Sequence, residues 1–107
     1  MSKMLESANL TAGLAELDGW QVNSASSGDS GPQLQKTYSF RGFNAAFGFM
    51  TRVAMQAERA NHHPDFQTAY SRVTVIWTTH SSGGITALDL ELARLTDLCA
   101  SDTALKA

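Results

Sequence analysis

Several residue types and patterns that mark common protein classes are scarce or absent in this sequence. The single cysteine, Cys99, excludes an intramolecular disulfide and a Cys-x-x-Cys motif for zinc or redox exchange. No run of about 18 apolar residues occurs, so no transmembrane helix is predicted. The formal net charge of −2 gives no broad basic field. Direct contact with nucleic acid or with a membrane surface is therefore not expected.

The N-terminal residues and the composition are those of an ordinary globular protein. Met1 to Leu5 lacks the apolar segment and cleavage site of a secretory signal, and we therefore expect a cytoplasmic protein. With 107 residues and 43% hydrophobic composition, residues 1–107 are expected to form a single domain around one core. Cys99 falls at an apolar helix position, which predicts a buried structural thiol.

Alternating apolar and polar residues predict two neighbouring strands in the first half of the chain. Residues 20–23 and 33–40 alternate, and a loop rich in Gly and Ser at 24–32 joins them. A loop of this size favours an antiparallel hairpin, and we expect the loop to be mobile. Lys36 interrupts the otherwise apolar face of the second strand.

Two segments of the first 64 residues have helical features. Thr11 is a candidate N-cap for a short helix that stops near Asp18-Gly19. A longer helix begins near Asn44 and must end before Pro64, since proline disfavours helical geometry in the preceding residue. The expected buried face of this helix consists of Phe43, Phe47, Met50, Val53, Ala54 and Ala57.

The remaining residues predict a second strand pair and a final helix. Residues 67–70 and 73–79 are strand candidates that a turn at Ser71-Arg72 would join. After a Gly-Gly break, Thr86 is expected to cap a helix with Asp89 as its third residue. The buried face of this helix is expected to contain Leu88, Leu92, Leu95 and Cys99.

This order of elements predicts an α+β fold. We expect a two-layer arrangement in the order α-β-β-α-β-β-α, with a four-stranded antiparallel sheet and helices on one face. The other sheet face would need cover in so small a chain. A homodimer or homotetramer that uses this face or an edge strand is therefore expected.

All three histidines fall at the ends of predicted elements. His62 and His63 follow the long helix, and His80 ends the strongest strand. Protein scaffolds often hold functional side chains at such positions, and imidazole exchanges protons near neutral pH. The pattern fits a site for general acid/base catalysis. On spacing alone, three surface or capping histidines are an equally open interpretation.

A metal site is a further alternative. Three imidazoles with Asp89 or Glu58 have the ligand types of a zinc site, although adjacent histidines usually point apart and no His-x-x-x-His spacing occurs. Nucleophilic catalysis is less well supported, because Cys99 lies on an apolar stripe and no Gly-x-Ser-x-Gly motif is present. Gly83-Gly84 lacks the spaced glycines and the lysine of a phosphate-binding loop.

One extended set of residues has a specific order and spacing. It comprises Ala57-Glu58-Arg59-Ala60-Asn61-His62-His63-Pro64-Asp65, Tyr70, Thr79-His80, Gly83-Gly84-Ile85-Thr86 and Asp89-Leu90. This pattern resembles that of the pterin-4a-carbinolamine dehydratase family. With the upstream Gly19-Trp20 and the phenylalanine-rich helix, the resemblance covers roughly residues 11–98.

The resemblance implies a lyase that converts 4a-hydroxytetrahydrobiopterin to quinonoid dihydrobiopterin and water, which supports tetrahydrobiopterin recycling. It implies no metal or redox cofactor, and it makes His62, His63 and His80 the catalytic residues, in contact with a pterin substrate. In animals, members of this family also act as dimerisation cofactors of a homeodomain transcription factor. A non-catalytic binding module of the same fold is therefore the alternative function.

Further residues at matching positions are expected to bind or orient the substrate. These candidates are Glu58, Asn61, Thr78, Thr79, Ser81 and Asp89. Glu58 lies one helical turn before His62, where it can orient the imidazole or remain a solvated carboxylate. Asp89 combines its capping position with that of the family's active-site acid, which supports the histidines.

The sequence departs from the family pattern at three places. Asn61 stands where members often have an acidic residue, and Ser81-Ser82 replaces the acidic residue common after the strand histidine. Phe66 occupies a position that is often tryptophan. The three imidazoles and Asp89 remain, so we expect these departures to affect substrate affinity and pH dependence more than the reaction.

Overall fold

The structure, a computed structural model, describes residues 7–24 and 32–101. Its elements are α1 (Ser7–Leu14), β1 (Gln21–Ser24), β2 (Pro32–Ser39), α2 (Phe43–Ala60), β3 (Asp65–Ala69), β4 (Arg72–Trp77), the 3-10 turn η1 (His80–Ser82) and α3 (Ala87–Ser101). This order confirms the predicted α+β fold with a four-stranded antiparallel sheet. None of the helices in these two described ranges combines the length and apolar character needed to cross a lipid bilayer.

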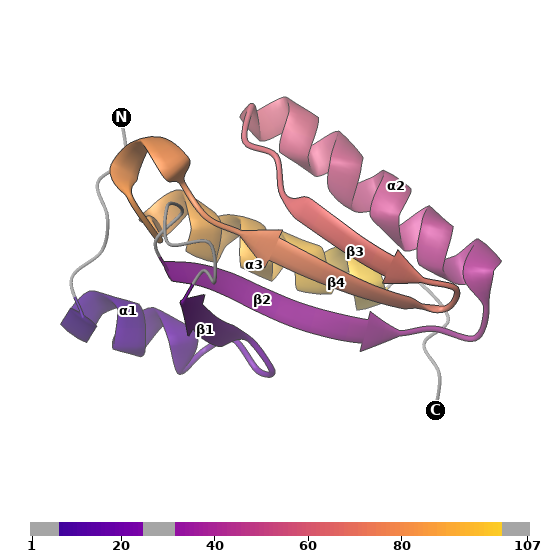
Figure 1. The fold of residues 1–107 in the computed structure, drawn as a ribbon, viewed down its shortest axis with the longest axis horizontal. Coiled ribbons are helices and arrows are strands. Elements are labelled where there is room, and N and C mark those ends of the chain that lie inside the picture. Colours follow the sequence, from indigo (N-terminus) through magenta and orange to yellow (C-terminus); the bar gives the residue numbers. More distant parts are fainter. Residues whose placement is uncertain (1–6, 25–31, 102–107) are drawn as a thin grey trace.

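The sheet has the strand order β1-β2-β4-β3, and each neighbouring pair is antiparallel. Both predicted hairpins are therefore present, and β4 is an interior strand between β2 and β3 (Figure 1). The pairing places Leu34 opposite Trp77 and Tyr38 opposite Val73, so these side chains share one face. The interior position of β4 explains its run of β-branched and aromatic residues.

The face shared by these side chains forms the hydrophobic core with the helices. Leu34, Phe40, Phe49, Val73, Val75 and Trp77 are almost fully buried. Phe49 of α2 lies 4.8 Å from Tyr38 and 4.9 Å from Phe40 between ring centroids. In Figure 1, α3 lies behind the sheet, and α2 packs against α3 and β4. The α1 helix approaches α3 closely, because a Cβ atom at Gly13 would lie only 2.5 Å from Leu90 Cδ1.

The opposite face of the sheet is mainly polar. It carries Gln35, Thr37, Gln67, Arg72 and Thr74, all exposed or half-buried. The hydroxyls of Thr37 and Thr74 are hydrogen-bonded across β2 and β4 at 2.7 Å. Such side chains are stable in contact with water, so this face does not need the cover that we expected from the fold alone.

Two predicted helices differ from those in the structure. The first begins at Ser7, so Thr11 lies inside the helix and the predicted N-cap is wrong. The α2 helix has the expected span but a rotated buried face, formed by Ala46, Phe49, Val53 and Ala57. Phe43 and Phe47 are 51% and 55% exposed, and their rings lie 5.8 Å apart. Periodicity located the helix, but several phenylalanines fit more than one stripe.

Smaller differences concern a turn, a loop and the last helix. The hairpin between β3 and β4 turns at Tyr70-Ser71, one residue earlier than predicted, and Tyr70 has a left-handed φ of 55°. The predicted mobility of the loop at 24–32 concerns residues 25–31, which lie outside the described residues. On α3, Leu92 and Cys99 are buried as predicted, whereas Leu88 and Leu95 are only partly buried. The buried positions of α3 also include Asp89, Ala93, Thr96 and Ala100.

Lys36 interrupts the apolar face of β2 because it has a specific partner in the structure. Its Nζ atom donates to Asp97 Oδ1 at 2.9 Å and to the Asp18 carbonyl at 2.8 Å. Asp97 also accepts hydrogen bonds from Trp20 Nε1 and from the Tyr38 hydroxyl. This Asp97 cluster joins α3 to β2 and to the segment that precedes β1.

Replacement of Tyr38 in the Asp97 cluster is expected to have a pH-dependent effect on stability. Burial, with the hydrogen bond to Asp97 and the charge of that carboxylate, raises the pKa of the Tyr38 hydroxyl above its ordinary value of 10.0. Tyr38→Phe should lower the free energy of unfolding at pH 7 by about 1–2 kcal/mol. The difference from wild type should shrink above about pH 10, where this tyrosine ionises in the unfolded chain only.

Denaturant titrations of wild type and Tyr38→Phe at several pH values from about 7 to 11 measure this difference. The other tyrosine, Tyr70, is 71% exposed, and Tyr70→Phe is the matched control. We expect the control to change the free energy of unfolding by no more than about 0.5 kcal/mol. A Tyr38→Phe effect of constant size over the whole pH range would contradict the prediction.

Candidate active site

The end of α2 fixes the backbone of His62. Asn61 has φ 53° and ψ 43°, a left-handed conformation that asparagine adopts more readily than most residues. Its N–H donates to the Glu58 carbonyl, and the His62 N–H donates to the Ala57 carbonyl, each at 3.1 Å. These two bonds form a Schellman motif, which ends the helix and sets the direction of the chain at His62. Asn61, expected to bind substrate, thus has a backbone role here.

The start of α3 holds a buried carboxylate. Asp89 is fully buried, and its Oδ2 atom accepts the backbone N–H of Thr86 at 2.8 Å. The Asp89 N–H donates to the Thr86 carbonyl at 3.1 Å. The contact between the Asp89 side chain and the Thr86 N–H is half of a capping box, as the sequence predicted, and the partial positive charge of the helix N-terminus favours the carboxylate there.

Asp89 joins the end of α2 to the end of β4. Its Oδ1 atom lies 2.7 Å from His62 Nε2, and the His62 side chain is only 15% exposed. Its Oδ2 atom accepts the Thr79 hydroxyl at 2.7 Å and lies 3.2 Å from the Thr86 hydroxyl. A buried carboxylate needs such partners, because an isolated charge in the protein interior is strongly destabilising. Side chains from two helix ends and one strand end therefore meet at one charged group.

An aromatic ring supports His62 from the sheet. The His62 ring stacks on Trp77 with 5.8 Å between centroids and 15° between planes. Trp77 is held in turn, since its Nε1 donates to Thr96 Oγ1 at 3.0 Å and the Thr96 hydroxyl donates to the Leu92 carbonyl at 2.6 Å. Contact with Trp77 on a ring face and with Asp89 at Nε2 restricts both the position and the rotation of the imidazole.

The other two histidines are more accessible. His63 Nε2 lies 2.9 Å from Glu58 Oε1, and their side chains are 58% and 82% exposed. Glu58 thus contacts the imidazole of His63 and not that of His62, which the spacing of one helical turn had suggested. His80 and Ser81 are exposed residues of η1, a turn between Thr79 and Gly84 whose backbones exchange two hydrogen bonds. The hydrogen bonds of Asp89 with His62, Thr79 and Thr86 form the Asp89 network. Because Thr79 directly precedes His80, this network fixes the base of the turn.

The hydroxyls of Thr78 and Thr79, two residues expected to bind or orient the substrate, have hydrogen-bond partners within the chain. Thr78 is buried, and its hydroxyl donates to the Pro32 carbonyl at 2.9 Å. The Thr79 hydroxyl contacts Asp89 and Thr86. Sequence reasoning missed Trp77 as the support of His62 and treated Thr86 only as a cap. The available indications were that Trp77 lies in a predicted strand and that Thr86 occupies a predicted capping position.

The described residues do not assemble the zinc site that the sequence left open. In residues 7–24 and 32–101, no three His, Cys, Asp or Glu side chains lie together as potential metal ligands. Instead, His62 pairs with Asp89 and His63 pairs with Glu58.

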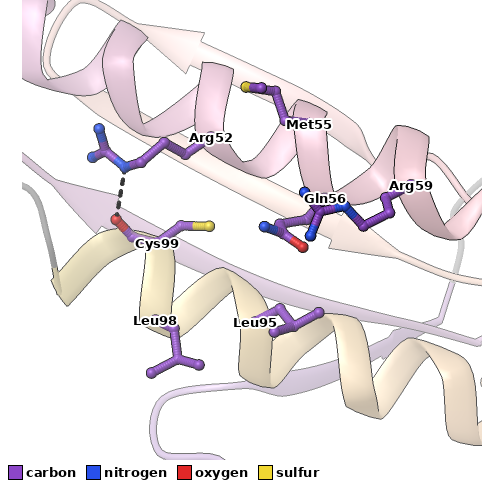
Figure 2. A pocket seen from close by; sticks show the side chains of 7 residues that line it. All are labelled: Arg52, Met55, Gln56, Arg59, Leu95, Leu98 and Cys99. Carbon is purple, nitrogen blue, oxygen red and sulfur yellow. Dashed lines mark hydrogen bonds between the residues drawn. The ribbon is translucent and has the colours of Figure 1, made fainter.

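A groove of about 270 Å³ lies between α2 and α3, and none of the three histidines lines it. Figure 2 shows the side chains that line it, which are Arg52, Met55, Gln56, Arg59, Leu95, Leu98 and Cys99. Arg52 Nε donates to the Cys99 carbonyl at 3.3 Å, close to the end of α3 where a cation is favourable. The groove has none of the acid/base pairs described above, so it is distinct from the candidate active site.

Bacterial relatives cover almost the whole chain. Three of them, from Rhizobium johnstonii, Rhizobium etli and Bordetella avium, carry the name pterin-4-alpha-carbinolamine dehydratase. They are 44%, 45% and 44% identical over 97, 100 and 101 residues. These matches cover 91%, 94% and 94% of this chain and 91%, 94% and 89% of the relatives.

Two solved structures have a similar fold, and a family profile matches most of the chain. A crystal structure from Brucella melitensis, described as a transcriptional coactivator/pterin dehydratase, has a TM-score of 0.82 at 37% identity and covers 92% of this chain and 99% of its own. A pterin dehydratase-like RuBisCO assembly factor of the alpha-carboxysome shares the fold, with a TM-score of 0.62 at 18% identity over 77% of this chain and 89% of its own. The profile of the pterin 4 alpha carbinolamine dehydratases matches residues 3–99, and the chain belongs to this family.

Proposed function

We propose that this protein dehydrates 4a-hydroxytetrahydrobiopterin to quinonoid dihydrobiopterin and thereby supports tetrahydrobiopterin recycling. The observation that carries the proposal is the buried Asp89–His62 pair, which lies between two helix ends and a strand end in a member of this family. A fully buried carboxylate holding a partly accessible imidazole is an arrangement suited to proton transfer. We also propose a cytoplasmic location.

The reaction requires two coupled proton transfers. The C4a–O bond breaks, and the hydroxyl leaves as water with a proton from an acid. The N5–H bond breaks as a base takes its proton, and the nitrogen electron pair forms the C4a=N5 double bond. His62, His63 and His80 are the proposed acid/base residues, with Glu58 oriented toward His63. The proposed reaction uses no metal or redox cofactor, because neither electron transfer nor a metal-bound nucleophile takes part in it.

A binding role is the second candidate function. The solved relative from Brucella melitensis is described as both a transcriptional coactivator and a pterin dehydratase. We therefore retain the alternative that this chain is a non-catalytic dimerisation or transcription-cofactor module. An assay of the carbinolamine separates the two functions, because only the enzyme accelerates its loss.

Activity should depend on the imidazoles. We expect the double variant His63→Ala, His80→Ala to lower kcat by about 10²- to 10⁴-fold, the usual contribution of a general acid or base. The measurement is the decay of the 4a-hydroxypterin absorbance with synthetic carbinolamine, with Glu91→Ala on the exposed surface of α3 as a control. A wild-type protein that gives only the buffer rate would refute the proposed function. A double variant with wild-type activity would refute the assigned residues.

We also propose that the chain forms a homodimer or homotetramer. Support comes from exposed apolar side chains along the outer surface of α2 and α3. Phe43, Phe47 and Met55 on α2 and Leu98 on α3 are each more than half exposed. Large exposed apolar side chains are unfavourable in water unless another surface covers them.

Assembly should be sensitive to this surface. The double variant Phe43→Ser, Phe47→Ser is expected to shift the protein toward monomers, because it removes two exposed rings without altering the buried face of α2. Light scattering coupled to gel filtration measures the mass. Val22→Ser on β1 is the control, since Val22 is also apolar and 42% exposed but lies outside α2. A monomeric wild type, or an unchanged mass in the double variant, would contradict the prediction.

A further inference from the structure

The groups that donate hydrogen bonds to Asp89 differ in whether they could also accept one. A carboxylate has only acceptor sites, so each polar partner must supply a proton. The Thr86 backbone N–H, 2.8 Å from Oδ2, can only donate. The Thr79 hydroxyl at 2.7 Å also donates to Oδ2, although a hydroxyl can rotate and accept instead. Asp89 Oδ2 is therefore committed to β4 and to the first turn of α3.

The Oδ1 atom of Asp89 faces His62, at 2.7 Å from Nε2. Because Oδ1 can only accept, the proton between them belongs to Nε2. A neutral imidazole carries one proton, so Nδ1 then has a free electron pair. A half-turn of the ring about Cβ–Cγ would keep the stacking on Trp77 but place Cε1 rather than Nε2 against Oδ1, so the hydrogen bond to Asp89 holds the ring orientation.

We propose that Thr79 and Thr86 are positioning residues that lock His62 in the Nε2–H tautomer through Asp89. Nδ1 is then the proton-accepting atom of the site, and His62 is the base that takes the N5 proton of the carbinolamine, while His63 or His80 supplies the proton for the departing water. The base role rests on the proposed function, whereas the tautomer does not. Thr79 acts through Asp89 and is not a substrate contact.

The variant Asp89→Asn should reverse the tautomer. Its amide oxygen has to accept the Thr86 N–H, since an NH₂ group at that position would face a donor. The NH₂ group then faces His62 and donates to Nε2, which must be unprotonated. The imidazole proton moves to Nδ1, and the site loses its base. An analogous change of histidine tautomer follows replacement of the aspartate in a serine protease triad.

Nitrogen-15 NMR of the histidine rings tests the tautomer without turnover. In wild type, two-bond correlations should show His62 protonated at Nε2, and in Asp89→Asn they should show it protonated at Nδ1. Glu91→Gln removes a carboxylate charge from the exposed side of the same helix and should leave the His62 resonances at wild-type positions. A wild-type His62 protonated at Nδ1, or an Asp89→Asn variant that keeps the Nε2 proton, would overturn the proposal.

Kinetics of two Thr79 variants test the positioning role without altering Asp89 itself. Thr79→Val keeps the side-chain volume but removes the donor to Oδ2, and we expect kcat to fall about 10-fold at unchanged KM, as for loss of an outer hydrogen-bond partner. Thr79→Ser keeps the hydroxyl and should restore most of kcat. A raised KM at unchanged kcat would overturn the proposal in favour of direct pterin contact, as would a Thr79→Ser variant no better than Thr79→Val.

The two tests also separate this proposal from the proposed function. If wild type shows the Nε2–H tautomer and Asp89→Asn reverses it, the lock is supported even in a protein that does not turn over the carbinolamine. If wild type turns over the carbinolamine but its His62 carries the proton on Nδ1, the lock is overturned while the dehydratase function stands.

Discussion

The buried carboxylate of Asp89 is the interaction on which the arrangement of this site depends. A carboxylate with no exposed surface is unstable unless protons reach both of its oxygens, and here they come from His62, Thr79 and Thr86. These partners belong to the end of α2, the end of β4 and the start of α3. One electrostatic requirement thus brings together three element ends that are separated by as many as 27 residues in the chain.

The sheet determines where this carboxylate and its imidazole can lie. Because β4 pairs with both β2 and β3, its last residues are held from two sides, and Trp77 presents its ring to His62 while its indole N–H is held by Thr96. His62 is therefore limited by a ring face and a charged hydrogen bond. His63, although adjacent in the chain, has only an exposed partner in Glu58, and exposed pairs contribute little to orientation. Neighbouring histidines thus have different degrees of preorganisation, which suits different roles.

A second carboxylate on α3 supports the same scaffold. Asp97 lies two turns after Asp89 and receives hydrogen bonds from Trp20, Lys36 and Tyr38. This Asp97 cluster fixes α3 against β2, while the Asp89 network fixes its first turn against β4. Because Asp89 and Asp97 each accept several hydrogen bonds from other elements, α3 is held at two points and has little freedom to slide along the sheet. The position of Asp89 relative to His62 therefore depends in part on residues far from the site.

The sequence by itself determined the order of elements, the fold class and the identity of the candidate site. The hydrophobic periodicity, Pro64 and the Thr86–Asp89 cap each involve residues that are close together in the sequence, so the sequence alone is enough to identify them. Only the tertiary structure decided that Phe49 rather than Phe47 faces the core, that Lys36 meets Asp97, and that His62 rather than His63 meets Asp89. These choices depend on contacts between residues far apart in the chain and on the rotation of whole helices, for which spacing along one segment holds no information. The tertiary structure thus places Asp89 and Trp77 against one of the three histidines, His62, with the Thr79 hydroxyl bonded to Asp89.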